Sequence, residues 1–208
     1  MFLGFPLRYL PARRQNDEHF SGWGEVTDVL FISSRDGVHF QRGQEAIIRP
    51  GLQLERWGGH CNNMVAAGIV ETPSDVPGSP NELSVYSIEN YYTQDSCQLR
   101  RYTWRLDGFA SITAPMDGGE LVTRPIRFTG KHLEINFSTS AAGSVRVQVQ
   151  DENGVPFENF TLDDSADIYG DSINQVVSWG DSTDLSGLAG QPIRLRFMLR
   201  DADLYSFQ

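Results

Sequence analysis

The chain has 208 residues, of which 27 are acidic and 17 basic, which gives a formal net charge of −10. This negative balance opposes binding to phosphate backbones, so no nucleic-acid partner is expected. No apolar run approaches the roughly 20 residues that a membrane helix needs, so no membrane partner is expected. The opening residues, MFLGFPLRYLPARR, lack the charged start and long apolar stretch of a secretory signal. The cellular location stays open.

Residues 1–104 carry two loose copies of one plan: a strand that ends in proline, a variable connection, then two or more strands. The apolar alternation in VLFIS and LSVYS makes these two segments correspond at a spacing of about 54 residues. A β unit repeated at about 40 to 55 residues is typical of propeller blades. We therefore predict a partial β-propeller of about two blades. Its expected strands cover 2–11, 27–42, 64–73, 81–92 and 97–105.

A turn signal lies inside the first copy. Asp36 and Gly37 stand between strand-forming residues in SSRDGVHF. Glycine tolerates a positive φ at little cost, so the pair predicts a hairpin with a type I′ turn.

Residues 105–208 have the alternating pattern of an antiparallel β-sandwich. The clearest segment is IRLRFMLRDADLYSF, where Ile193, Leu195, Phe197 and Leu199 alternate with arginines. Successive side chains of a strand point to opposite faces, so this pattern predicts one dry and one wet face. Glycine, proline and aspartate cluster between the segments, and 184–192 has room for one helical turn at most. The expected strands are 118–128, 133–140, 143–154, 160–164, 173–179 and 193–207.

Several segments of this half resemble a known family. RRYTWRLDGFASI, GGELVTRPIRF, STSAAGSVRVQVQD, DLSGLAGQPIRLRF and DADLYSF resemble the C-terminal end of bacterial glycoside-hydrolase-like proteins. Those proteins are similar to glycoside hydrolase families 32 and 43, in which a five-bladed β-propeller precedes a β-sandwich. Upstream, GFPLRY, SSRDGVHF and ELSVY resemble the last two blades. The resemblance covers nearly the whole chain and implies action on, or binding of, carbohydrate without a cofactor.

The chain departs from that family in its catalytic residues. The family's pocket forms where five blades meet, and its nucleophilic carboxylate comes from the first blade. Hydrolysis needs two carboxylates about 5 Å apart for retention, or roughly 6.5 to 9.5 Å apart for inversion. With about two blades, the chain has no counterpart of the first-blade carboxylate, so no catalytic residue is assigned. We expect it to be the C-terminal portion of such a protein, or a stand-alone remnant, and not catalytically complete alone.

The segment RWGGHCNNM contains the predicted carbohydrate-binding residues. It precedes an inner strand, where propeller loops open toward the axis. Trp57 offers an aromatic face, and His60, Asn62 and Asn63 offer hydrogen-bonding groups. Sugars present C–H faces to rings and hydroxyls to amides, so this mixture suits a carbohydrate pocket. The alternative is a packed tryptophan beside a solvated polar loop.

Other residues are weaker candidates for the same predicted site. Two could line the mouth of the pocket, namely Arg8 and Trp23. One carboxylate near an expected strand end or loop tip could be the relic of an acid/base or transition-state-stabilising group. The four candidates are Glu25, Asp28, Asp36 and Glu82. Most exposed carboxylates are merely solvated, so none is assigned a catalytic role.

The last third has an acidic stretch without basic residues between Arg146 and Arg194. Calcium prefers several oxygens from closely spaced carboxylates and carbonyls, but the spacing does not match an EF-hand loop. A solvated acidic edge is the first interpretation, with calcium as the alternative, and no metal ligand is assigned. The carboxylates concerned are Asp163, Asp164, Asp167, Asp171, Asp181 and Asp184.

Two cysteines, Cys61 and Cys97, allow at most one intrachain disulfide and match no zinc-binding spacing. Two small buried side chains are expected, with a disulfide between neighbouring strands as the alternative.

Two other classes of function stay open. One is a non-catalytic carbohydrate-binding module, favoured by the Trp57 segment and the missing carboxylate. The other is a structural or oligomerisation domain. Two blades of an open propeller expose strand edges, which are a liability in water, so our hypothesis is a homo-oligomer that covers these edges.

Overall fold

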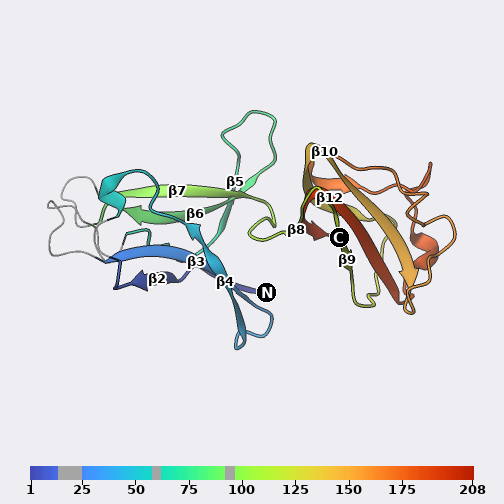
Figure 1. Ribbon diagram of the computed structural model, residues 1–208, viewed down its shortest axis with the longest axis horizontal. Coiled ribbons are helices and arrows are strands. Elements are labelled where there is room, and N and C mark those ends of the chain that lie inside the picture. The colour runs from blue at the N-terminus through green and yellow to red at the C-terminus, as the bar shows by residue number, and fades with distance from the viewer. Residues whose placement is uncertain (14–24, 58–61, 92–96) are drawn as a thin grey trace. The chain divides into compact units, whose positions relative to one another are not determined.

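The computed structural model describes residues 1–13, 25–57, 62–91 and 97–208. The prediction of an all-β protein is confirmed, because these residues form several open antiparallel sheets (Figure 1). The chain divides into two compact units, an N-terminal unit at Met1–Trp104 and a C-terminal unit at Arg105–Gln208. Among the described residues, no helix is long and apolar enough to cross a membrane.

The first sheet of the N-terminal unit is centred on β3 (Val26–Ser34). One edge is β4 (Phe40–Ile48), and the other consists of β1 (Phe2–Gly4) and β2 (Leu7–Leu10) in succession. Proline has no amide hydrogen for the ladder, and Pro6 accordingly lies at the break between β1 and β2. Its carbonyl still accepts a hydrogen bond from the Leu30 amide at 3.0 Å, so both pieces stay on the same neighbour.

The second sheet repeats this arrangement. β6 (Glu82–Glu89) lies between β5 (Val70–Thr72) and β7 (Gln98–Arg105). An antiparallel bridge between Val65 and Ser87 extends the β5 edge upstream. VLFIS and LSVYS, the two segments matched in the sequence, therefore lie in the middle strands of two sheets with the same order.

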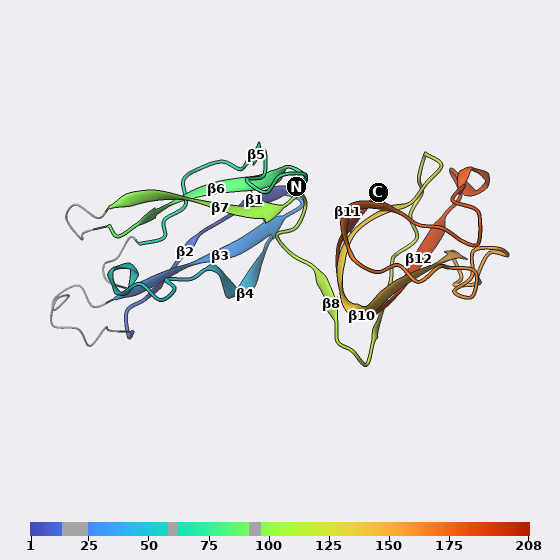
Figure 2. The ribbon, with the colours of Figure 1, turned by 90° about the horizontal axis from the view of Figure 1, so that it is seen from above.

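The two sheets of this unit pack through a small apolar core, and they appear as two layers in both ribbon views (Figures 1 and 2). Val29, Ile48 and Val85 are at most 1% exposed. Around them pack partly buried apolar and aromatic side chains: Phe5, Leu7, Ile47, Val65, Ile69, Tyr102 and Trp104. Among the described residues this cluster has three fully buried members, and polar contacts between the layers, described below, add to it.

The predicted hairpin between β3 and β4 is present, but its type I′ turn is wrong. A type I′ turn needs positive φ at both central residues. Gly37 has φ +76°, whereas Asp36 is not in that region. The Asp36 carboxylate instead accepts hydrogen bonds from the amides of Val38 and His39, and this side-chain bonding builds a longer loop.

The C-terminal unit is organised around two long antiparallel strands, β10 (Glu134–Asp151) and β12 (Ile193–Phe207). β11 (Asp171–Val176) pairs with the first part of β10. Two short strands pair with β12: β9 (Gly119–Val122) with its first half and β8 (Ile112–Ala114) with its last part. The alternation predicted for 193–199 is confirmed, because Ile193, Leu195, Phe197 and Leu199 are at most 3% exposed.

The long strand pair bends sharply in its middle, as Figure 2 shows for β10. Thr139 pairs with Ala202 and Ser144 with Arg200, so four residues of β10 oppose Asp201 alone. Such a bulge bends the strands that carry it. The separate strands predicted at 133–140 and 143–154 are therefore one bent strand, which lets its two halves cover a common core.

That core is closed by loops as well as by strands. The Trp179 indole donates a hydrogen bond to the Val147 carbonyl at 2.7 Å, and Phe160 packs edge-on against it at 5.3 Å between ring centroids. The strand predicted at 160–164 is wrong. The Asp164 carboxylate accepts hydrogen bonds from the Thr161 amide at 3.0 Å and hydroxyl at 2.7 Å, which holds this segment as a turn. The expected helical turn is present at Ser186–Leu188.

We predict that Gly143→Ala destabilises the C-terminal unit. A methyl group at Gly143 would lie 2.4 Å from the Asp201 carbonyl oxygen and 2.8 Å from that of Arg200, so the bend would have to open. Overpacking of this kind costs about 1–3 kcal/mol, measurable as a lower urea midpoint. Gly187→Ala is the matched control, because nothing lies within 4 Å of a methyl group there. Equal midpoints for both variants would contradict the prediction.

Candidate functional site: a groove with an exposed tryptophan

A groove of about 430 Å³ lies on the first sheet of the N-terminal unit. Its lining mixes apolar, charged and aromatic side chains from β2, β3, β4 and the segment that follows β4. Val29 and Leu7 point into the core, so their neighbours Asp28 and Arg8 point to the opposite face, on which the groove lies. The lining residues are Arg8, Leu10, Arg13, Val26, Asp28, Glu45, Ala46, Arg49, Pro50 and Trp57.

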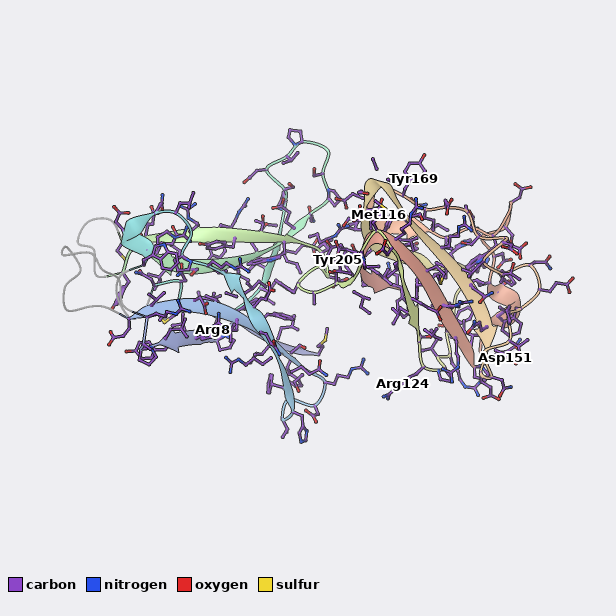
Figure 3. The ribbon with its side chains drawn as sticks, viewed as in Figure 1. Arg8, Met116, Arg124, Asp151, Tyr169 and Tyr205 are labelled. Atoms are coloured by element: carbon purple, nitrogen blue, oxygen red, sulfur yellow. The ribbon has the colours of Figure 1, made fainter. Side chains whose placement is uncertain are left out.

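Two of these residues form a direct cross-strand ion pair. Arg8 on β2 and Asp28 on β3 are register partners. Arg8 Nε lies 2.9 Å from Asp28 Oδ1, and Arg8 Nη2 lies 2.5 Å from Asp28 Oδ2. A third donor, Arg8 Nη1, reaches the Gln44 carbonyl at 3.0 Å. This bidentate pairing fixes both side chains, and the pKa of Arg8 is raised by its hydrogen bonds to Asp28. Figure 3 labels Arg8 in this sheet.

Trp57 stands at the edge of the groove, directly after a 3-10 turn at Leu54–Arg56. Its indole nitrogen donates a hydrogen bond to the Gly51 carbonyl at 2.7 Å, yet 40% of the residue is exposed. Gly51 has φ +78°, a conformation that glycine adopts without strain. The ring is therefore held in place while a large apolar surface faces solvent.

Behind this turn lies a buried carboxylate that sequence reasoning missed. Glu89 ends β6, and its side chain is 0% exposed. Oε1 forms an ion pair with Arg56 Nη2 and accepts a hydrogen bond from the Tyr102 hydroxyl, each at 2.6 Å. Oε2 accepts from Arg100 Nε at 2.6 Å and from Gln98 Nε2 at 3.2 Å. Both oxygens are thus saturated by donors from the 3-10 turn and from β7.

These contacts decide the charge of the cluster. Burial raises the pKa of a carboxyl group, but hydrogen bonds from Tyr102 and Arg100 and the charge of Arg56 outweigh it, so the pKa of Glu89 is lowered. Burial and the bond to Glu89 together raise the pKa of Tyr102 to about 12. Glu89 is therefore an anion and Tyr102 a neutral donor at neutral pH.

The structure places the sequence-predicted site residues in two different environments. Trp57 lines the groove, as do Arg8 and Asp28. Asn62 and Asn63 are instead buried, at 1% and 0% exposure. His60 and Trp23 lie outside the described residues.

Asn62 has a role inside the protein. Its Oδ1 accepts from the Tyr91 amide at 2.6 Å, and its Nδ2 donates to the Glu55 carbonyl at 3.3 Å. Asn62 thus ties the 3-10 turn to the residues after β6. Asn63 adopts a φ of 66°, and its backbone N–H donates a hydrogen bond to the Ile88 carbonyl at 2.7 Å. Both asparagines fix the chain between the sheets, and neither lines the groove.

Two of the remaining candidate carboxylates, Asp36 and Glu82, have partners in local structure. Asp36 caps the β3–β4 loop and lies 2.7 Å from His39 Nδ1; these hydrogen bonds lower its pKa far below the usual range. Glu82 accepts from the Ser74 hydroxyl at 2.7 Å. Glu25 lies immediately before β3 and does not line the groove.

Several carboxylates of the acidic stretch also have partners within the chain. Asp167 pairs with Arg146 at 2.6 Å and Asp171 with Arg105 at 2.7 Å, while Asp184 accepts from the Ser186 amide at 2.8 Å. Across residues 1–13, 25–57, 62–91 and 97–208, no cluster of three or more His, Cys, Asp or Glu side chains could hold a metal ion.

The expectation of two buried cysteines is wrong for Cys97, which is an exposed free thiol. Cys61 lies outside the described residues.

Comparison of the chain with protein-family models, with curated proteins and with solved structures gave no match.

We predict that the stabilising effect of Glu89 is lost in acid. Its folded pKa lies below the unfolded value of about 4.3, so the carboxylate stabilises the fold above that pH and the effect fades as pH falls through the folded pKa. Hydrogen exchange of the β6 amides should show Glu89→Gln to be about 3 kcal/mol less stable at neutral pH. The difference from the natural sequence should shrink below about pH 4. A difference that stays constant from pH 7 to pH 3 would contradict this assignment.

Proposed function

We propose that the N-terminal unit binds carbohydrate in the groove beside Trp57. The observation that carries this proposal is a 40% exposed indole ring, fixed by its own hydrogen bond, next to a bidentate arginine–aspartate pair. Aromatic faces stack on the C–H faces of sugar rings, and charged side chains donate to and accept from hydroxyls. A fixed ring loses little conformational entropy on binding.

The charged residues of the groove support binding more than bond cleavage. Hydrolysis of a glycosidic bond needs two carboxyl groups that both reach the substrate. The groove offers two carboxylates, and each faces an arginine: Asp28 is paired with Arg8, and Glu45 lies 3.3 Å from Arg49. Both carboxylates are thus engaged by arginines of the same lining, and an engaged carboxylate is less available to a substrate than a free one. A glycoside-hydrolase-like ancestry, implied by the resemblance, would fit a sugar site whose catalytic residues are not contained in this chain.

A second candidate function is an assembly surface, favoured by the position of the groove. The groove lies on the face of the first sheet opposite the core, and Leu10, Val26 and Ala46 form an apolar part of its lining. A propeller blade normally has a neighbour on each face. A further sheet, from a second copy of this chain or from a longer protein, would bury this surface.

We predict that Trp57→Ala weakens sugar binding measurably without abolishing it. Loss of an aromatic anchor costs about 2 kcal/mol, which corresponds to about 30-fold in Kd. A panel of neutral and acidic oligosaccharides, followed by calorimetry on the best binder, measures this. Tyr169→Ala removes a 72% exposed ring in the C-terminal unit and serves as the control.

The outcomes separate the two candidate functions. Binding that keeps its strength in Tyr169→Ala but weakens in Trp57→Ala supports the sugar site. Absence of binding across the panel, together with a dimeric or larger mass in light scattering, would overturn the sugar site and favour assembly.

A further inference from the structure

We propose that Glu89 is a positioning residue for the sugar site: through Arg56 and Gly51, the buried carboxylate fixes the orientation of the Trp57 ring. This inference rests on the proposed function for its consequence in binding. It goes further because Glu89 belongs to the second sheet and does not line the groove.

The first step runs from Glu89 to Arg56. The carboxylate has no exposed surface, and the Arg56 side chain is 11% exposed. Their contact is 2.6 Å long, and Arg56 also contacts the Tyr102 hydroxyl. Because both side chains are largely buried, solvent screens this ion pair less than it screens a pair on the surface.

The second step runs from Arg56 to Gly51. A methyl group at Gly51 would lie only 3.1 Å from Arg56 Nη1, so the guanidinium lies beside Gly51, where a larger residue would have its side chain. The Arg56 amide also donates to the Gln53 carbonyl at 3.2 Å, which closes the 3-10 turn between them. The guanidinium therefore supports the loop from inside.

The third step runs from Gly51 to the ring. The Gly51 carbonyl accepts the Trp57 indole hydrogen bond at 2.7 Å. An exposed ring with one polar anchor takes its orientation from the position of that acceptor. Displacement of Gly51 would therefore move the ring, although neither residue touches Glu89 in these contacts.

Glu89→Gln tests the proposal, because glutamine keeps the shape of the side chain and removes its charge. Two readouts are expected to change: faster hydrogen exchange of the Arg56 amide, and sugar binding weaker by about tenfold, since small displacements of a positioned group have large effects. A double-mutant cycle of Glu89→Gln and Trp57→Ala measures whether the two residues act on sugar affinity together, which a general loss of stability would not produce. In the Trp57→Ala background, Glu89→Gln should cause no further loss of affinity.

Arg100→Gln is the matched control. It removes the other arginine of Glu89 from the β7 side, 2.6 Å from Oε2, and does not touch the Gly51 loop. It should lower stability while leaving the Arg56 amide exchange and the sugar affinity within about twofold of the natural sequence. If Glu89→Gln does not fold, Arg56→Gln replaces it, because Glu89 then keeps Arg100 and Tyr102 as partners.

Unchanged Arg56 exchange in Glu89→Gln would overturn the proposal, as would an equal loss of affinity with and without Trp57. Failure of the proposed function has a different signature. If no sugar binds, or if Trp57→Ala binds normally, the sugar site is wrong, while amide exchange still decides whether Glu89 holds the loop.

Discussion

A carboxylate without exposed surface must be neutralised where it is buried, and the N-terminal unit is arranged around this requirement at Glu89. The donors come from both sides of the carboxylate: Arg56 from the segment after the first sheet, Arg100 and Tyr102 from β7. The apolar core between the sheets is small, so these charge-assisted hydrogen bonds fix how the loop after β4 meets the second sheet. The same loop holds the exposed Trp57 ring through the carbonyl of Gly51.

The C-terminal unit depends on a different constraint, the bend shared by β10 and β12. Four residues oppose one at this point, and Gly143 leaves room for the carbonyl of Asp201. The bend allows two strands to contribute to both halves of one apolar core, with Phe137 and Phe197 buried. Loops then complete the covering, including the turn held by Asp164. The unit is thus sandwich-like without a second sheet of long strands.

The groove combines features of a ligand site and of a packing surface. Arg8 and Asp28 satisfy one another, which lets two charges remain on a largely covered strand without a ligand. Apolar side chains surround this pair, and a fixed aromatic ring stands at the border. A sugar would use the ring and the free lone pairs of the carboxylate, whereas a further sheet would use the apolar residues. The proposed sugar site and the alternative assembly surface therefore draw on different residues of the same face.

Local alternation was enough to predict the all-β class, the matched middle strands β3 and β6, and the dry face of β12, because side chains on a strand alternate whatever its neighbours are. The same alternation indicated where Glu89 lies: it is four residues after the buried Val85, so both side chains point to the inward face of β6. Other features depend on contacts between residues distant in sequence. Only tertiary structure decided that Asn62 is buried while Trp57 is exposed, and that 133–154 bends as one strand. Packing partners and hydrogen-bond acceptors set these outcomes, and a one-dimensional pattern does not contain them.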